Sequence, residues 1–163
     1  MKKAMIKYMQ NPINDELYTP EEAIRPLLPY VDPTCDIWEP TDPGNSKIRE
    51  MLLMNGNNCF GTNENFFKNE PKFIYDAIIT NPPYSLKDEF LERCYELGKP
   101  FALLLPITAL EGVRRGKMFR EYGLQLLVLD KRINFMPEKN GSWFNVSWFT
   151  WGILPNDLIF VEV

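Results

Sequence analysis

The chain contains no histidine among its 163 residues. Histidine is the commonest general base near neutral pH, the usual partner of a nucleophilic serine or cysteine, and the commonest metal ligand. Its absence excludes the Ser-His and Cys-His nucleophile pairs and most metal sites. Any catalysis by this protein must therefore proceed without imidazole.

Cysteine is also scarce. Cys35, Cys59 and Cys94 are odd in number, far apart and not in CxxC spacing. This pattern predicts reduced thiols of an intracellular, cytoplasmic protein, with neither a disulfide framework nor a metal site.

Long apolar runs are missing as well. The run "FALLLPI" is much shorter than the roughly 20 residues that cross a bilayer, and the first residues, "MKKAMIKYMQNP", carry charge but no sustained apolar stretch. We therefore expect no membrane span and no signal peptide.

The length and the balance of 45% apolar and 25% charged residues predict a single globular domain over residues 1–163. A net charge of −4 argues against nucleic-acid binding by the whole surface, but residues 111–139 hold seven Lys and Arg against four acids. That stretch is either a face that meets phosphates or an ordinary solvated helix face.

Apolar runs alternate with amphipathic segments along the chain. The predicted strands lie in "CDIWEP", "NNCFGTN", "YDAIIT", "PFALLLPI", "LQLLVLD" and "SWFNVSWFTWGI". Helices are expected in "YTPEEAIRPLL", "SKIREMLLMNG" and "SLKDEFLERCYELGKP", and between Thr108 and Gly123. This order predicts an α/β fold with a mainly parallel sheet, in which ligands bind beyond the carboxyl ends of the strands.

Two of these helices begin with capping patterns. Thr19 is the expected N-cap of the first helix, with Pro20 at the first helical position and Glu22 completing a capping box. Ser85 and Asp88 form the same kind of pair at the start of "SLKDEFLERCYELGKP".

The segment Asn-Pro-Pro-Tyr, residues 81–84, directly follows the run "YDAIIT" and so falls at the predicted binding edge. An exocyclic amino group is a poor nucleophile because its lone pair is delocalised into the ring. The Asn81 side-chain oxygen and the Pro82 carbonyl can accept its two hydrogens and favour the reactive pyramidal geometry, while Tyr84 stacks on the base. This chemistry needs no histidine. The alternative is that the two prolines simply end a strand.

The stretch "DAIITNPPYSLKDEFLERCYELGKPFALLLP" resembles the phage- and prophage-type DNA adenine methyltransferase-like family of class I S-adenosylmethionine-dependent methyltransferases. The resemblance runs over about residues 15–152 and includes "DELYTPEEAIRPLLPY", "DIWEP" and "LDKRINF". It implies a Rossmann-like, seven-stranded, mainly parallel sheet with helices on both faces. It also implies methyl transfer from S-adenosylmethionine to an exocyclic amine, with adenine N6 in DNA preferred.

By position, the resemblance makes Asn81, Pro82, Pro83 and Tyr84 the catalytic motif. The cofactor-binding residues that it implies are Tyr18, Thr19, Pro20, Glu39, Gly44, Asn63 and Asn65. The segment 18–20 would approach the methionine end of the cofactor, Glu39 would lie in the cofactor loop, Asn63 would face the ribose, and Asn65 would help place the cofactor's adenine or the target amine.

The sequence departs from the family pattern in this cofactor site. The first loop, "EPTDPGNSK", has Gly44 as its single glycine, and asparagines stand at 63 and 65 where acids are expected. An amide binds a hydroxyl less strongly than a carboxylate does, so we expect weaker cofactor binding than the family shows. At Asn65, turn formation is an equal explanation.

The chain has room for a catalytic sheet but none for a separate target-recognition domain. Target choice would then come from a short loop, a partner chain or a homo-oligomer, with DNA favoured over RNA as the nucleic acid. Two alternatives stay open: a catalytically silent methyltransferase fold that serves as a binding module or subunit, and a protein-glutamine methyltransferase, since that class shares Asn-Pro-Pro-Tyr.

Overall fold

The computed structural model describes residues 18–135 and 143–163 and contains one seven-stranded sheet in the order β2-β1-β3-β4-β8-β5-β9. Only β8 is antiparallel to its neighbours, β4 and β5; the other neighbouring pairs are parallel. The strands are β1 Asp36–Glu39, β2 Asn58–Gly61, β3 Ala77–Thr80, β4 Phe101–Pro106, β5 Gln125–Leu129, β8 Val146–Trp151 and β9 Leu158–Val161. The predicted mainly parallel α/β sheet is confirmed.

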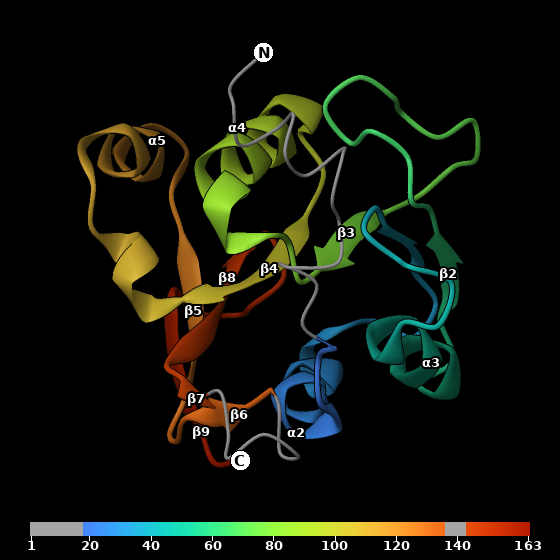
Figure 1. Ribbon diagram of the computed structural model, residues 1–163, viewed down its shortest axis with the longest axis horizontal. Coiled ribbons are helices and arrows are strands. Elements are labelled where there is room, and N and C mark those ends of the chain that lie inside the picture. The colour runs from blue at the N-terminus through green and yellow to red at the C-terminus, as the bar shows by residue number, and fades with distance from the viewer. Residues whose placement is uncertain (1–17, 136–142) are drawn as a thin grey trace.

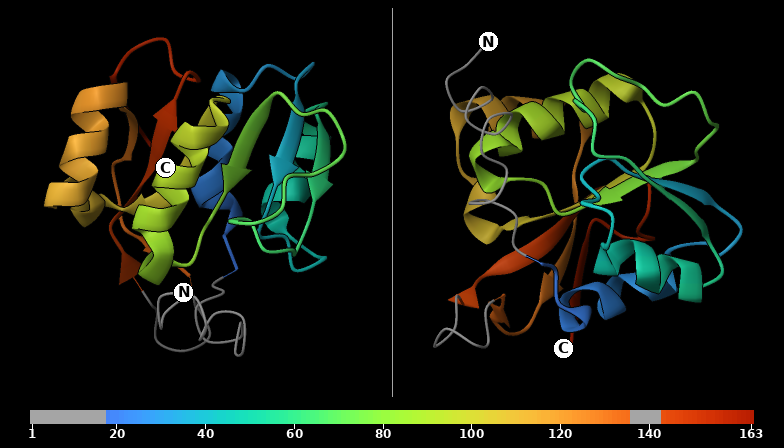
Figure 2. Two further views of the ribbon diagram at one scale, coloured as in Figure 1. Left: turned by 90° about the horizontal axis from the view of Figure 1, so that it is seen from above. Right: turned by 45° about the vertical axis from the view of Figure 1, so that its right-hand side comes forward.

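Helices cover both faces of the sheet (Figures 1 and 2). One face carries α2 Glu21–Ile24, the 3-10 helix η2 Arg25–Tyr30 and α3 Lys47–Met54. The other face carries η3 Tyr84–Leu86, α4 Lys87–Leu97, η4 Ile107–Leu110 and α5 Val113–Tyr122. A separate small ladder pairs β6 Ile133–Asn134 with β7 Trp143–Phe144.

Two hydrophobic cores result, one on each face, because successive side chains of a strand point to opposite sides. In β1, Ile37 packs into the core beneath α2 and α3, while Trp38 packs into the core beneath α4 and α5. The central strands β3, β4 and β8 are buried along nearly their whole length. That double burial explains their continuous apolar sequences.

The expected helix starts are wrong in three places. Pro20, not Thr19, is the N-cap of α2, and no side chain caps it. The helix tightens into η2 from Arg25 onward because Pro26 and Pro29 lack the N–H groups that an α-helix needs. The third predicted helix begins as α4 only at Lys87, after the 3-10 turn η3, and its N-cap residue is Leu86. The fourth begins as α5 at Val113, after η4, and not at Thr108.

The connection from β2 to β3 contains no helix or strand. Residues 62–76 leave the edge of the sheet, swing outward and return to the start of β3 on the far side of β1 (Figure 1). This long irregular loop runs along the sheet face that also carries α4, and its aromatic residues Phe66 and Tyr75 join the core there.

Three smaller findings complete the fold. Cys35, Cys59 and Cys94 are free thiols. None of the helices within residues 18–135 and 143–163 has the length and apolarity of a membrane span. The same residues contain no cluster of acids and thiols placed to hold a metal ion.

Candidate active site

Three adjacent parallel strands, β2, β1 and β3, end at the same edge of the sheet. Glu39 at the end of β1 is in register with Gly61 of β2, and β3 lies on the other side of β1. The loops that follow, residues 40–46, 62–65 and 81–84, therefore leave the sheet side by side. This is the edge at which ligands bind in open α/β sheets.

The segment 18–20 meets Asn-Pro-Pro-Tyr through one hydrogen bond. The Asn81 amide Nδ2 donates to the Thr19 hydroxyl at 3.0 Å. Thr19 is buried, with 8% of its surface exposed. Its hydroxyl therefore holds the side chain of Asn81 and does not cap a helix.

Tyr18 reaches the loop after β1. Its ring is mostly exposed, and its hydroxyl accepts a 3.0 Å hydrogen bond from the Asn45 amide, next to Gly44. Pro20 is half-buried. The segment 18–20 thus contacts both the first loop and the Asn-Pro-Pro-Tyr motif, and its place at the methionine end of a cofactor stays a prediction.

The first loop folds around Asp42. One oxygen of this buried carboxylate accepts the backbone N–H groups of Gly44 at 2.7 Å and Ser46 at 3.1 Å. Gly44 has a φ of 102°, which only glycine adopts easily, and Gly61 leaves room for Asp42, since an added Cβ would lie 1.9 Å from its Oδ2. Two N–H groups of the loop therefore point inward to Asp42 and are already hydrogen-bonded.

Glu39 is a buried carboxyl group at the centre of this edge, with 2% of its surface exposed. Its Oε1 accepts a 2.6 Å hydrogen bond from the Ser46 hydroxyl, while Oε2 accepts none from the described residues. Burial, reinforced by nearby Asp42, raises the pKa of Glu39 to about 8. The group is therefore mostly protonated at neutral pH when no ligand is bound.

Asn63 and Asn65 lie in the loop after β2 but differ in role. Asn63 is exposed. The Asn65 side-chain oxygen accepts the Phe67 N–H at 3.1 Å, and its carbonyl accepts the N–H groups of Lys68 and Asn69. Asn65 thus organises a turn, which favours the turn explanation for that residue.

The Asn-Pro-Pro-Tyr motif is deeply set. Pro82 and Pro83 are buried, and the Pro83 carbonyl accepts the Leu86 N–H at 2.9 Å. The half-buried Tyr84 ring packs against both hydrophobic cores. These side chains therefore contribute to the hydrophobic cores, because the turn into α4 folds them back over the ends of the strands.

Part of the basic stretch at 111–139 is neutralised by α4. Arg114 pairs with Glu89 and Glu92, and Arg115 pairs with Asp88. These ion pairs join α5 to α4 and favour a structural explanation for both arginines. Lys117 and Arg120 are the exposed cations of α5.

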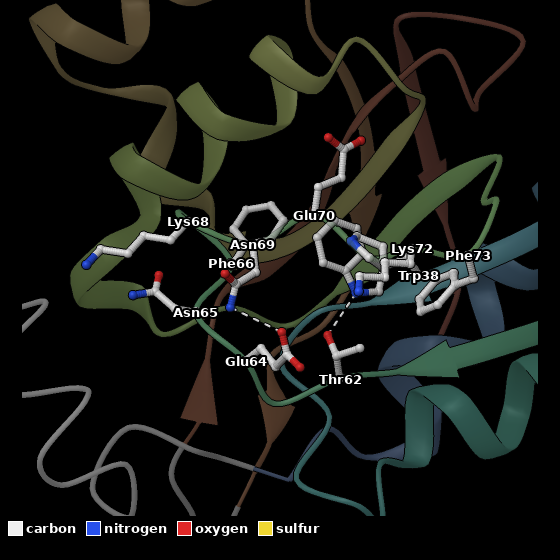
Figure 3. Close-up of a pocket in the computed structure, with 11 residues that line it drawn as sticks. Trp38, Thr62, Glu64, Asn65, Phe66, Lys68, Asn69, Glu70, Lys72 and Phe73 are labelled. Atoms are coloured by element: carbon white, nitrogen blue, oxygen red, sulfur yellow. Dashed lines mark hydrogen bonds between the residues drawn. The ribbon is translucent and has the colours of Figure 1, made fainter.

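A hollow of about 620 Å³ lies inside the β2–β3 connection and was not foreseen from the sequence (Figure 3). Its lining consists of Trp38, Thr62, Glu64, Asn65, Phe66, Lys68, Asn69, Glu70, Pro71, Lys72 and Phe73. The mixture of aromatic and charged residues in "NENFFKNEPKF" is the sequence signal that could have indicated this hollow.

Solved structures of similar fold are methyltransferases and modification enzymes. A chain of a type I restriction–modification system is 13% identical with a TM-score of 0.57, covering 98% of this chain and 47% of that one. The M protein of the type I restriction enzyme EcoKI is 15% identical with a TM-score of 0.52, covering 98% and 51%. A putative class I S-adenosylmethionine-dependent methyltransferase from Listeria monocytogenes is 10% identical with a TM-score of 0.51, covering 98% and 70%.

These comparisons concern architecture alone, because the identities are low. No family model matches the chain, and no curated protein is detectably similar to it in sequence. The chain spans about half the length of the two restriction–modification proteins. The fold is therefore the Rossmann-like fold of class I methyltransferases, as predicted.

Proposed function

We propose that this protein transfers a methyl group from S-adenosylmethionine to an exocyclic amino group, with N6 of adenine in DNA as the preferred target. One observation carries the proposal. Asn81 stands at the carboxyl end of the buried strand β3, beside the loops after β1 and β2, and its amide is held in place by Thr19. The methyltransferase fold supports the same conclusion.

The residues at this edge fit the proposed cofactor in chemical character. S-adenosylmethionine supplies a methyl group on a positively charged sulfur. Glu39 offers a buried carboxyl oxygen that accepts no hydrogen bond from the described residues, which suits the cationic methionine end. A Cβ at Gly44 would meet no protein atom within 4 Å, so the loop leaves open space beside its backbone. Tyr18, Thr19, Pro20, Asn63 and Asn65 complete the proposed binding set.

The Thr19 hydrogen bond also bears on the chemistry of Asn81. With Nδ2 donating to Thr19, the amide is oriented so that Oδ1 is the end that would accept from the target amine. Oδ1 and the Pro82 carbonyl together would accept the two amine hydrogens and favour the pyramidal nitrogen. This interaction strengthens as the nitrogen attacks, so it lowers the barrier more than it tightens binding.

Tyr84 would hold the target base. Its ring packs against both cores on one side and is half-buried, so stacking is confined to the remaining surface. Base–aromatic stacking is worth about 1–3 kcal/mol per base. The proline pair and the turn into α4 fix the ring before the base arrives, which reduces the entropy lost on binding.

A specific observation favours a second candidate, a catalytically silent methyltransferase fold used as a binding module. Asp42 already occupies the N–H groups of Gly44 and Ser46. A loop whose donors are satisfied internally has fewer to give to a cofactor. On this alternative the edge would be retained for its shape and would not carry out methyl transfer.

Two measurements test the proposal. Calorimetry with S-adenosylmethionine should show binding, and transfer of labelled methyl groups should be seen with mixed-sequence DNA and be lost in Asn81→Ala. RNA and a glutamine-bearing peptide serve as alternative acceptors, and labelling of the peptide alone would establish the glutamine methyltransferase instead. Absence of cofactor binding would favour the silent fold.

A further inference from the structure

The hollow inside the β2–β3 connection has a continuous aromatic wall. Phe73 packs on Phe60 with ring centroids 4.7 Å apart, and Trp38 packs on Phe66 at 5.3 Å. Phe73 is half-buried and Phe60 is 38% exposed, so the first pair presents ring surface outward. Trp38 and Phe73 are both among the lining residues drawn in Figure 3. A partly exposed aromatic ring offers a surface on which a nucleobase can stack.

The polar groups around the wall include two carboxylates and two lysines, whose formal charges balance, but the lysines are not tied up in ion pairs within the described residues. Glu64 accepts a hydrogen bond from the Asn69 amide at 3.1 Å, and Glu70 accepts one from the Tyr75 hydroxyl at 3.2 Å. Both carboxylates thus have neutral donors. Lys68 and Lys72 are exposed, and neither forms an ion pair with a carboxylate of the described residues.

These features match the parts of one nucleotide in a strand. The aromatic wall suits the base, the Asn69 amide and the Glu64 carboxylate offer donor and acceptor groups for its edge, and the two lysines suit the phosphates on either side. A volume of about 620 Å³ is large enough for such a unit.

The hollow also adjoins the candidate active site. Asn65 lines it and belongs to the loop after β2. Phe66, the next residue, stacks on Phe90 of α4 with ring centroids 4.7 Å apart, and α4 follows directly from Tyr84 and η3. A nucleic-acid strand that presents one base to Asn81 therefore has a second aromatic surface nearby on which another base can stack.

We infer that this hollow binds a nucleotide of the target nucleic acid outside the base that is methylated, and so contributes to the choice of target. The inference rests on the proposed function for the identity of the strand, but the binding event is separable from methyl transfer.

The test measures binding of a fluorescently labelled, mixed-sequence single-stranded DNA by anisotropy at a series of salt concentrations. Phe73→Leu keeps an apolar side chain against Phe60 but removes the aromatic face. It should weaken binding about five- to hundred-fold, the range for one lost base stack. The double variant Lys68→Ala/Lys72→Ala should lower the slope of log K against log salt by about 1.4, since each phosphate contact contributes about 0.7 on a single strand.

The matched control is Lys117→Ala/Arg120→Ala, which removes the same charge from α5. It should leave the salt slope nearly unchanged. Equal losses from both double variants would overturn the inference, as would unchanged binding in Phe73→Leu. Excess free deoxyadenosine monophosphate should displace the strand poorly; displacement at the strand's own affinity would mean a site for a free nucleotide and would also overturn it.

Calorimetry with S-adenosylmethionine separates this inference from the proposed function. Both hollow variants should bind the cofactor as the wild type does, and loss of that binding would show that the loop merely supports the fold. If the wild type binds DNA through Phe73 but transfers no methyl group, the inference about the hollow holds and the proposed methyltransferase function is refuted. If the wild type transfers methyl groups and the hollow variants bind DNA as it does, the proposed function holds and the inference about the hollow is refuted.

Discussion

The Asn81 side chain donates a 3.0 Å hydrogen bond to the hydroxyl of Thr19, a residue 62 positions earlier in the chain. This contact joins the two parts of the candidate site that lie furthest apart in sequence. It also fixes the amide in one orientation, which gives Thr19 a role that the sequence pattern did not predict.

Thr19→Val removes the acceptor while keeping the shape of the side chain. We expect kcat for methyl transfer to fall at least tenfold with a smaller change in KM, because Asn81 loses its orientation. Leaving the amide hydrogen without its acceptor should also cost about 1–3 kcal/mol of folding stability. Thr19→Ser, which retains the hydroxyl, should behave much like the wild type. Wild-type transfer by Thr19→Val would show that the hydrogen bond has no part in catalysis.

Tyr84 should contribute to stability as well as to base binding. Tyr84→Ala should lower the free energy of unfolding by about 1–3 kcal/mol, less than for a fully buried aromatic residue, because the ring packs on both cores. Tyr84→Phe should retain both the packing and the stacking face. Denaturant unfolding and DNA binding measured on the two variants test this. If Tyr84→Ala is as stable as the wild type, the ring does not belong to the core.

The buried Glu39 should make stability depend on pH. Its pKa is raised from 4.5 to about 8 in the folded protein, so between these values the folded state holds a proton that the unfolded chain releases. Stability should be greatest at low pH and fall as pH rises to about 8, by up to about 1.4 kcal/mol per pH unit.

Glu39→Gln should abolish that slope, since glutamine does not ionise. Glu96→Gln is the control, because the Glu96 side chain is 60% exposed in its pair with Arg93. Unfolding midpoints measured at intervals of about one pH unit between pH 5 and 9 test this prediction. An unchanged slope in Glu39→Gln would place the titrating group elsewhere.

Asn63→Asp should tighten cofactor binding. Asn63 is exposed at the end of β2, where a carboxylate would accept hydrogen bonds from ribose hydroxyls with its full charge. Such an exchange is worth on the order of 1–2 kcal/mol, or about tenfold in affinity. Calorimetric titration compares the two proteins. Sub-micromolar binding by the wild type, unaltered in Asn63→Asp, would show that the loop is not impaired.

Gly61→Ala should be strongly destabilising, because its Cβ would lie 1.9 Å from the buried carboxylate of Asp42. We expect a loss of about 2 kcal/mol or more in the free energy of unfolding. Combining it with Asp42→Ala should recover part of that loss, since the contacts with the carboxyl group at 1.9 and 2.6 Å are removed, while the contact with the Cβ at 2.7 Å stays. Additive effects in this double-mutant cycle would contradict direct contact between the two residues.

The sheet was predictable because its central strands are buried on both faces and carry apolar runs that no helix period explains. The first residues of the helices were not predictable, since the prolines at 26, 29, 82 and 83 produce 3-10 turns that depend on the packing around them. The strand β9 was missed although "LIFVEV" is apolar, because it is an edge strand with Leu158 and Phe160 exposed.

The candidate site was foreseen in part. Sequence reasoning placed the loops that hold residues 39, 44, 63 and 81–84 at one edge because they follow parallel strands, and those strands do end together. Residues 18–20 were placed beside them by the family resemblance alone, and the hydrogen bond from Asn81 to Thr19 joins that segment to the same edge. It could not foresee that Asp42 would occupy the loop's N–H groups, or that residues 62–76 would enclose a hollow. Both arise from contacts between segments that have no periodic signal.

β2 is the outermost strand on its side of the sheet and pairs, among the described residues, only with β1. Edge strands open locally far more often than central ones, so β2 should exchange its amide hydrogens early while β4 and β8 retain theirs. The connection that follows β2 holds both Asn63, proposed to meet the cofactor's ribose, and the hollow proposed to bind the target nucleic acid. Ligand binding at either place would therefore register first as slowed amide exchange along residues 58–76, a readout that requires no turnover and no knowledge of the target sequence.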